Sequence, residues 1–311
     1  MNIENVVVRH LGEKRQYERE YSDGPVEDEM LNLVKSTDFK QRRREMLANN
    51  PSWAMYYHFT PLRGNLVNWK TFRPGSRILE IGAGCGAITE ALLETVDGST
   101  TVDALELTEK RALINAYRNK KYSNLEVIVG NLEDFDKKNY DYVICVGVLE
   151  YSGRFISGDS PYEDFLKKLF GFLKPGGELL LAIENKLGIK YFNGSREDHI
   201  GKHYESLMDY PQYDGIRTFS RKELLGMFTN VGFRNTELYL PLPDYKIPKI
   251  VINEKLLDTT DNLSFVTRIA PAPAFDQPRI HSASEQLLTS SIIDAGLYID
   301  MTNSFLVRGV K

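Results

Sequence analysis

The most informative run of residues is Glu80-Ile81-Gly82-Ala83-Gly84-Cys85-Gly86. Its glycines lie where a buried strand is predicted to turn into a helix, so that the backbone can approach a ligand closely. The pattern Gly82-x-Gly84-x-x-Ala87 also satisfies the loose dinucleotide-binding fingerprint. Glu106 follows about 20 residues later, at the predicted end of the next strand, where an acid can accept both hydroxyls of a ribose. These residues predict a nucleoside-cofactor site, and they leave NAD(P) and S-adenosylmethionine (SAM) open.

Three features favour SAM over NAD(P). Glu80 precedes the first glycine by two residues, so its carboxylate can order the loop and face an ammonium group, which SAM has and NAD lacks. Asn131 follows the third predicted strand, where a polar residue can hydrogen-bond the edge of adenine. Lys174-Pro175-Gly176-Gly177 makes a tight turn directly into the fifth predicted strand. SAM is therefore the predicted cofactor, and an NAD(P)-binding oxidoreductase remains the alternative.

Candidate residues for acid–base chemistry follow the fourth and fifth predicted strands, because active sites of open α/β sheets lie beyond the carboxyl ends of the strands. Glu150 follows the fourth strand, and Glu184 and Asn185 end the fifth. His199 lies in the polar insertion after it and can accept a proton near neutral pH. We expect His199 and Glu150 to be the catalytic residues. Asp198 is not expected to orient His199, since neighbouring side chains usually diverge.

The elements around these residues alternate between short apolar runs and helical segments, as in a parallel α/β sheet. The predicted strands are 77–82, 101–106, 125–129, 142–146 and 179–183, with a last strand at 304–308 that returns to the sheet. Residues 6–8 form a short strand and residues 26–47 a helix in this interpretation. Ser220 and Glu223 have the spacing of a capping box at the start of another helix, which Gly232 ends.

The composition excludes several classes of protein. Lys and Arg number 39 and Asp and Glu 43, a net charge of −4 over 311 residues, which argues against general nucleic-acid binding. No apolar run approaches the roughly 18 to 20 residues that span a bilayer, and the N-terminus lacks the pattern of a secretory signal. Cys85 and Cys145 cannot make a disulfide framework, so a reducing cytoplasm is the predicted location.

These motifs, in this order, resemble those of the class I SAM-dependent methyltransferases over residues 56–245 and the final strand. The resemblance implies an α/β, Rossmann-like, seven-stranded sheet with an antiparallel strand seven, and S-adenosylhomocysteine as the product. It also implies that the glycines pass the methionine part of SAM and that Glu106 holds the ribose. Asn131 stands where many relatives have an acid. The cofactor-binding residues expected on this basis are Glu80, Gly82, Ala83, Gly84, Gly86, Glu106, Leu107, Asn131, Leu132 and Tyr57.

A narrower resemblance is to a bacterial subgroup that occurs with glycosyltransferases of cell-surface polysaccharide assembly. It rests on Thr60-Pro61-Leu62-Arg63-Gly64-Asn65, Asn115-Ala116-Tyr117-Arg118-Asn119 and Ile183-Glu184-Asn185-Lys186-Leu187-Gly188. It implies O-methylation of a carbohydrate or sugar-linked intermediate, and association with glycosyltransferases. A SAM-binding module without catalysis, within a polysaccharide-synthesis assembly, is the alternative.

Acceptor contacts and metal dependence complete the expectations. The substrate-binding residues expected are Tyr151, Asn185 and Tyr245. No metal ion is expected. The alternative is Mg²⁺ on Glu150, Glu184 and Asn185, a pattern that resembles catechol and some sugar O-methyltransferases. The expected domains are an N-terminal helical extension (1–55), a SAM-binding core (56–245), an insertion or lid (246–300) and a final core strand (301–311).

Overall fold

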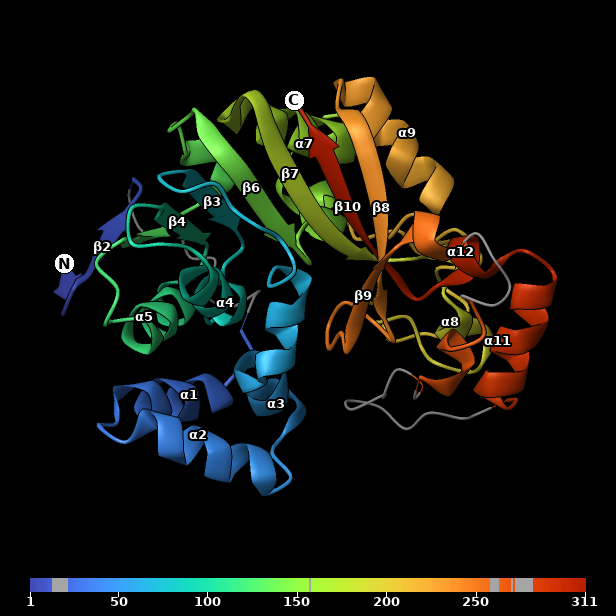
Figure 1. Cartoon of the computed structure of the whole chain (residues 1–311), viewed down its shortest axis with the longest axis horizontal. Coiled ribbons are helices and arrows are strands. Elements are labelled where there is room, and N and C mark those ends of the chain that lie inside the picture. Colours follow the sequence, from blue (N-terminus) through green and yellow to red (C-terminus); the bar gives the residue numbers. More distant parts are fainter. Residues whose placement is uncertain (13–21, 157, 258–262, 270, 272–281) are drawn as a thin grey trace. The chain divides into compact units, whose positions relative to one another are not determined.

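The computed structural model divides into two compact units, Met1–Ile144 (unit 1) and Cys145–Lys311 (unit 2). It describes residues 1–12, 22–156, 158–257, 263–269, 271 and 282–311. Figure 1 labels most of the helices and strands of both units. Each unit is a piece of β-sheet flanked by helices, which confirms the predicted α/β, Rossmann-like fold class. Among the described residues, no helix is long and apolar enough to cross a membrane.

The sheet of unit 1 is almost entirely parallel. Its strands follow the order β1, β2, β5, β4, β3, and only β1 and β2 are antiparallel to each other. The central strands are apolar and buried, as expected for a parallel sheet covered on both faces. The strands of this unit are β1 (Asn2–Ile3), β2 (Val6–His10), β3 (Arg77–Ile81), β4 (Thr101–Glu106) and β5 (Leu125–Val129). A further strand, β6 (Tyr140–Val146), begins in this unit and ends just after its last residue, Ile144. The short strand predicted at residues 6–8 is thus confirmed as part of β2.

Helices pack against this sheet and against one another. Contacts join α4 and α5 to the strands, and α1 packs on α5. The helix predicted over residues 26–47 is wrong as a single element, because the chain breaks at Ser36, whose ψ of 146° is extended. Polar residues such as Ser36 and Asp38 favour helix ends over helix interiors. The helices are α1 (Val26–Lys35), α2 (Phe39–Ala48), α3 (Trp53–Phe59), α4 (Ala87–Thr95), α5 (Glu109–Arg118), and the short η1 (Pro61–Leu66) and η2 (Leu132–Asp134).

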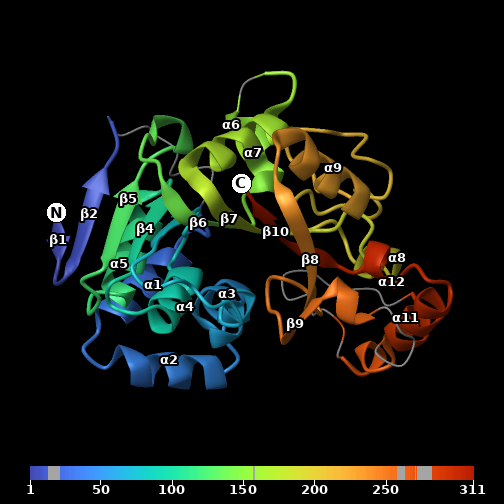
Figure 2. The ribbon, with the colours of Figure 1, turned by 45° about the horizontal axis from the view of Figure 1, so that its top comes forward.

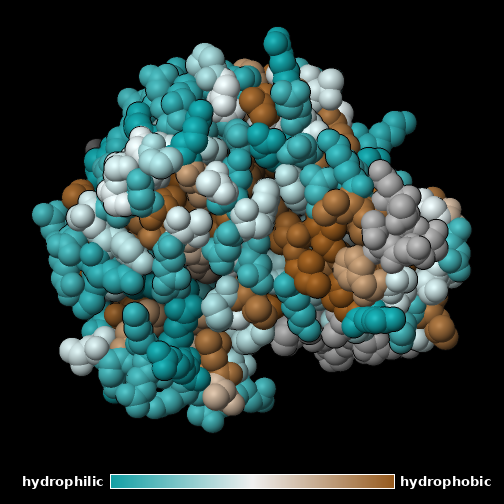
Figure 3. Space-filling view, in the orientation of Figure 1, coloured by the Kyte–Doolittle hydropathy of each residue, from teal (hydrophilic) through white to brown (hydrophobic). Residues whose placement is uncertain are grey.

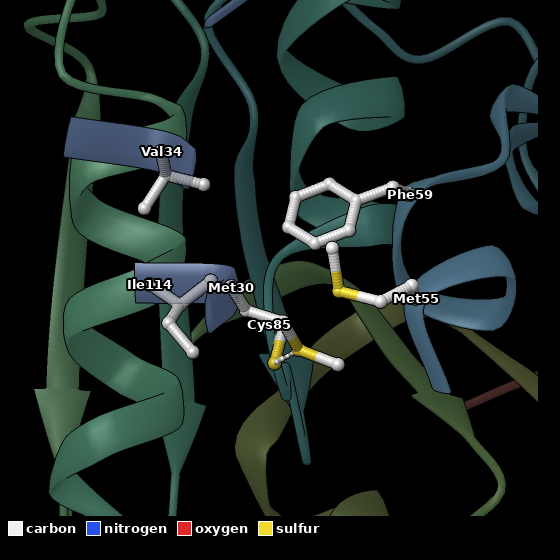
Figure 4. Packing of buried hydrophobic residues seen from close by; sticks show 6 residues of the cluster. All are labelled: Met30, Val34, Met55, Phe59, Cys85 and Ile114. Atoms are coloured by element: carbon white, nitrogen blue, oxygen red, sulfur yellow. Dashed lines mark hydrogen bonds between the residues drawn. The ribbon is translucent and has the colours of Figure 1, made fainter. Parts of the chain in front are cut away.

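A hydrophobic cluster joins the N-terminal helices to the glycine loop (Figure 4). Met30 and Val34 of α1 pack with Ile114 of α5, and Met55 and Phe59 of α3 complete the cluster together with Cys85 of the loop. The sulfur atoms of Met30 and Cys85 are 3.9 Å apart. The segment before residue 60 therefore shares its core with the loop.

The sheet of unit 2 is antiparallel. Its strands follow the order β7, β10, β8, β9. The predicted return of the last strand is confirmed, because Ser304 pairs with Glu184 and Val310 with Glu178. Beyond the seven strands that the resemblance implies, unit 1 adds β1 and β2, the second of which contains the predicted strand at residues 6–8, and unit 2 adds β9. The strands are β7 (Leu173–Glu184), β8 (Arg234–Leu242), β9 (Ile250–Asn253) and β10 (Ser304–Val310).

Two groups of helices flank this second sheet (Figure 2). α7 packs on β7 and on α9, and α9 packs on β8. The capping box of Ser220 and Glu223 is confirmed at the start of α9, and Gly232 ends it with a φ of 105°. The helices are α6 (Ser152–Phe155), α7 (Pro161–Phe172), α8 (Ile189–Phe192), α9 (Arg221–Val231), α11 (Glu285–Asp294) and α12 (Tyr298–Met301), with the short η3 (Leu149–Tyr151), η4 (Glu254–Leu257) and η5 (Val266–Arg268).

The segment predicted as an insertion or lid, residues 246–300, holds β9, η4, η5, α11 and most of α12, and part of it lies outside the described residues. α11 contacts α8, α12 and η5 within unit 2. Figure 3 shows a hydrophobic area over β9 and the segment that follows it, where Ile250 and Leu256 are 41% and 63% exposed. A role of this segment as a lid stays a prediction.

Candidate functional site

The glycine loop leaves β3 and enters α4 in a conformation that glycine favours. Gly82, Gly84 and Gly86 have φ angles of 68°, 52° and 81°. The loop is tied to the end of β4, because Ala83 N donates to Leu105 O at 3.0 Å. A Cβ on Gly86 would lie 2.3 Å from Asn115 Oδ1, so a side chain cannot be added there without displacing α5. Backbone conformation and close packing together therefore require glycine at this position.

Glu80 is buried at the end of β3 and belongs to a chain of polar side chains. Its Oε2 accepts a hydrogen bond from Thr89 Oγ1 at 2.6 Å, and Thr89 in turn accepts one from Asn115 Nδ2 at 2.9 Å. Burial raises the pKa of Glu80 to about 8, even though the bond from Thr89 lowers it. This arrangement connects the residue before the loop to the helix against which Gly86 packs. The expectation that Glu80 faces the ammonium group of SAM stays a prediction.

Glu106 holds the glycine loop from the end of β4. Its Oε2 accepts from Gly84 N at 2.8 Å, and its Oε1 accepts from Thr108 N at 2.9 Å and from Thr108 Oγ1 at 3.1 Å. A ribose would therefore have to compete with these donors or use the remaining lone pairs. The predicted ribose contact is compatible with this geometry and stays a prediction.

The residues expected near adenine lie at the ends of β4 and β5. Asn131 caps η2, with its Oδ1 accepting from Glu133 N at 3.0 Å. Leu132 is buried and Leu107 is half-buried. Because the Oδ1 of Asn131 is engaged in the cap, its amide nitrogen is the group left to meet a base edge. Their contacts with adenine stay predictions.

Sequence reasoning missed a buried cation beside Tyr57. The guanidinium carbon of Arg63 lies 3.8 Å from the centre of the Tyr57 ring. Arg63 is 6% exposed, and within the described residues its Nε and Nη1 have no hydrogen-bond partner. Its positive charge also lowers the pKa of Glu80. In the sequence Arg63 appeared only as part of the motif Thr60-Pro61-Leu62-Arg63-Gly64-Asn65, and nothing in that motif marked it as a buried cation.

In unit 2 the structure brings the two predicted catalytic residues together with Glu184. His199 Nε2 lies 3.6 Å from Glu150 Oε1 and 3.9 Å from Glu184 Oε1. Glu150 follows β6 in η3, Glu184 is the last residue of β7, and all three side chains are buried. Their convergence gives this site a group that can take up or release a proton.

Glu197 orients His199, and the sequence analysis did not consider it. Its Oε1 lies 3.0 Å from His199 Nδ1, and its Oε2 accepts from the backbone N of His199 at 2.8 Å and of Ile200 at 2.6 Å. Tyr210 Oη also donates to Glu197 Oε1 at 3.3 Å. Asp198 turns away toward Lys190, as expected. A carboxylate two residues before a histidine can accept its backbone N–H, which is a local signal for this role.

Two lysines complete what we call the buried charge cluster. Lys190 Nζ lies 2.7 Å from Asp244 Oδ2, and Lys246 Nζ lies 3.0 Å from Glu184 Oε1. Burial would lower the pKa of each lysine, but the surrounding carboxylates raise both. The buried charge cluster consists of Glu150, Glu184, Glu197, Asp198, Asp244, Lys190, Lys246 and His199. No sequence signal pointed to the lysines, since Asp244 lies 54 residues from Lys190 and Glu184 lies 62 residues from Lys246.

Mutual electrostatics shift the protonation of this cluster. Burial raises the pKa of Glu150, and the neighbouring Glu184 carboxylate raises it further. Burial alone would lower the pKa of His199, but Tyr151 and the carboxylates of Glu184, Glu150 and Glu197 raise it well above its usual value. The cluster by itself therefore favours a protonated imidazole.

The three expected substrate-binding residues have different surroundings. The ring of Tyr151 meets His199 edge-on at 5.2 Å, and Tyr245 Oη donates to Glu184 Oε1 at 3.2 Å. Both tyrosines therefore border the buried charge cluster. The amide of Asn185 instead donates to the backbone oxygens of Asp300 and Thr302 and accepts from Leu187 N, so it ties β7 to the segment before β10. We leave Asn185 out of the proposed acceptor site.

Unit 2 also contains a cavity of about 360 Å³, within the size range of small-molecule sites. Its walls mix apolar and polar side chains, including Ile189, Leu242, Val266, Glu285 and Asn303. Ile189 precedes Lys190, and Asn303 donates to the backbone oxygen of Pro243, the residue before Asp244. The cavity therefore adjoins the chain segments that carry the buried charge cluster.

Comparison with known proteins finds a family match over about a third of the chain. Residues 79–179 match the model of a family described as "Methyltransferase domain". The ubiquinone biosynthesis O-methyltransferase of Schizosaccharomyces pombe, a mitochondrial protein, is 33% identical over 113 residues, which are 35% of this chain and 38% of that protein. The ubiquinone biosynthesis O-methyltransferase of Rickettsia typhi is 29% identical over 119 residues, or 38% of this chain and 45% of the relative. The chain spans less than half the length of these curated relatives.

A solved structure is also similar. It is that of Haemonchus contortus phosphoethanolamine N-methyltransferase 2 in complex with SAM, at 16% identity and a TM-score of 0.47, covering 91% of this chain and 60% of that one. The family match spans β3, the glycine loop, β4, β5 and β6 and ends within β7. It thus contains most of the expected cofactor residues as well as Glu150. Residues 79–179 therefore match a methyltransferase domain.

Proposed function

We propose that the chain transfers the methyl group of SAM to a hydroxyl group of its acceptor. The acceptor oxygen attacks the methyl carbon, and the carbon–sulfur bond breaks with its electron pair on sulfur, giving S-adenosylhomocysteine. The hydroxyl proton must leave to the protein or to solvent. Because the sulfonium is a good leaving group, alignment and removal of this proton are what the protein has to supply.

The observation that carries the proposal is the convergence of Glu150, Glu184 and His199 in unit 2. An acceptor hydroxyl needs a group that takes its proton, and this site offers two carboxylates that each lie within 4 Å of an imidazole. Glu150 and His199 are the proposed catalytic residues. Glu197 is a positioning residue, since it holds the imidazole through Nδ1. Tyr151 and Tyr245 are the proposed acceptor contacts.

In unit 1 we propose that the backbone of the glycine loop lies alongside the methionine part of SAM. Arg63 would bind its carboxylate, because a buried guanidinium with two unengaged nitrogens suits that group. Glu106 would meet the ribose, and Asn131, Leu132 and Leu107 the adenine. Glu80 would face the ammonium group of the methionine part.

We propose two classes of acceptor, and a different observation supports each. The subgroup motifs support a carbohydrate or sugar-linked hydroxyl and association with glycosyltransferases, and the free cysteines Cys85 and Cys145 support a cytoplasmic location. The relatives named as O-methyltransferases of ubiquinone biosynthesis support a hydroxyl of an intermediate in that biosynthesis instead. The cavity of unit 2, with apolar walls at Ile189, Leu242 and Val266, suits a partly apolar acceptor of the second kind.

Calorimetric titration with SAM, S-adenosylhomocysteine, NAD⁺ and NADP⁺ tests the cofactor. Binding of the first two that is weakened in Glu106→Ala supports the proposal, and binding of a nicotinamide cofactor instead would overturn it. Transfer of radiolabelled methyl to a panel of sugar and phenolic hydroxyls then tests the acceptor. Cofactor binding without transfer to any acceptor would favour the module without catalysis.

A further inference from the structure

The buried charge cluster contains two carboxylates whose oxygens are not all satisfied. Glu150 and Glu184 are 1% and 0% exposed. Across the described ranges of the chain, the Oε2 atom of each has no hydrogen-bond partner. Buried carboxylate oxygens are rarely left without a donor or a cation, because removing a charge from water is costly. Oε1 of Glu184 already meets Lys246 and accepts from Tyr245, so it is the two Oε2 atoms that are short of a positively charged or hydrogen-bond-donating group.

The cationic side chains of the cluster do not balance its acids. Two lysines and one histidine face five carboxylates. Lys190 is held between Asp198 and Asp244, away from Glu150. Lys246 is shared between Glu184 and Asp198, so the cluster has more acids than cations even with a protonated imidazole.

The geometry of the three side chains is close to that of a metal site. One ligand atom from each of Glu150, Glu184 and His199 lies within 4.8 Å of the other two. Two ligands bound to one ion at about 2.1 Å lie roughly 3 to 4.2 Å apart. The separations of His199 Nε2 from the carboxylates, 3.6 and 3.9 Å, already fall in this range. The two carboxylates need to close by about half an ångström at most.

We infer that Glu150, Glu184 and His199 bind one divalent cation. Two carboxylates and an imidazole suit an ion of the Mn²⁺ or Zn²⁺ kind better than Mg²⁺ or Ca²⁺, which prefer oxygen ligands alone. Glu197 supplies the outer hydrogen bond to Nδ1 that metal-bound histidines usually have. The ligand set differs from the alternative suggested by sequence, because the Asn185 amide is engaged elsewhere and His199 takes its place.

Only the catalytic consequence of this inference rests on the proposed function. A cation at this position would lower the pKa of an acceptor hydroxyl bound to it. His199 Nε2 would then be a ligand and could not also take up the proton of the acceptor. Metal binding itself does not require methyl transfer.

The test is titration of the metal-stripped full chain with Mn²⁺, followed by electron paramagnetic resonance and calorimetry. We expect one Mn²⁺ per chain, and a nitrogen coupling in the pulsed resonance spectrum of the wild-type protein that shows an imidazole ligand. Glu150→Gln and Glu184→Gln should each weaken binding roughly tenfold or more. Glu205→Gln is the matched control, because Glu205 is a buried acid of the same unit whose carboxylate accepts from Gln212 N, and it should bind Mn²⁺ as the wild type does.

Each outcome decides the inference. Absence of Mn²⁺ and Zn²⁺ binding, or binding unchanged in both variants, overturns it. A wild-type spectrum without nitrogen coupling overturns it even if a variant fails to fold. If the metal-stripped chain binds SAM and transfers methyl groups at the full rate, the proposed function stands and the catalytic consequence is wrong. If Mn²⁺ binds but no acceptor is methylated, the metal site stands and the proposed function fails.

Discussion

The glycine loop of unit 1 and the buried charge cluster of unit 2 both lie at strand ends, but they are built differently. The loop is one continuous run of residues whose contacts are made largely by backbone atoms, such as Gly84 N to Glu106. The cluster is assembled from side chains between Glu150 and Lys246 that meet only in the folded chain. The loop should therefore be sensitive to an added Cβ and the cluster to a changed functional group.

The largest effect we expect is loss of turnover in His199→Gln. Whether His199 takes a proton or binds a cation, its Nε2 is lost, and kcat should fall about 10³-fold. The affinity for SAM should not change, since the proposed cofactor residues are in unit 1. Steady-state kinetics and calorimetry on the same preparation check both statements.

The matched control is His203→Gln, a change of the same type four residues further along. It should keep the wild-type kcat. An equal loss in both variants would mean that the whole segment, and not the cluster, is what turnover requires.

A smaller effect, on stability, is expected for Gly86→Ala. The new Cβ would meet Asn115 Oδ1 at 2.3 Å in a residue with a φ of 81°, so unfolding free energy should fall by about 3 kcal/mol. Gly84→Ala isolates the backbone contribution, because no described heavy atom outside its chain neighbours lies within 4 Å of the added Cβ and its φ is 52°. It should cost about 1 kcal/mol. Urea denaturation measures both, and equal losses would contradict the packing argument.

The same contrast explains what could be predicted from the sequence. The strands, the glycine loop and the cap at Ser220 were predictable because each depends on residues that are neighbours in the chain. The break at Ser36 was missed because the residues on both sides of it are helical and no glycine or proline separates them. Lys190 and Asp244 are 54 residues apart, and no periodicity encodes such a pair. Glu197 was within reach of local reasoning, but an acid near a histidine is too common to single out.

Glu80→Gln should remove a pH dependence of stability. The pKa of Glu80 is raised to about 8 by burial, so its contribution is fully present below the unfolded pKa near 4.5 and is lost as pH rises toward 8. The unfolding free energy of the wild type should fall by about 1.4 kcal/mol at most for each pH unit in this window. Between pH 5 and 7 the total loss should be roughly 2 kcal/mol. Glutamine resembles the protonated acid and does not titrate.

The measurement is urea denaturation of both proteins at pH 5, 6 and 7. The difference in unfolding free energy between wild type and Glu80→Gln should change in favour of the variant as pH rises. A constant difference would show that Glu80 is ionised throughout, and that its bond from Thr89 and the charge of Arg63 outweigh burial.

The smallest effect we expect is that of Arg63→Met on cofactor affinity. Loss of the guanidinium should weaken the binding of SAM and S-adenosylhomocysteine about tenfold, or by about 1.4 kcal/mol. The reason is that the proposed contact with the carboxylate of the methionine part is lost. Methylthioadenosine lacks that carboxylate and serves as the matched ligand, so its affinity should not change. Because Arg63 Nε and Nη1 lack partners among the described residues, methionine should not lower the unfolding free energy. Equal weakening of all three ligands would instead mean that Arg63 supports Tyr57 or the loop, and that unit 1, like unit 2, depends on a buried side-chain charge for its architecture.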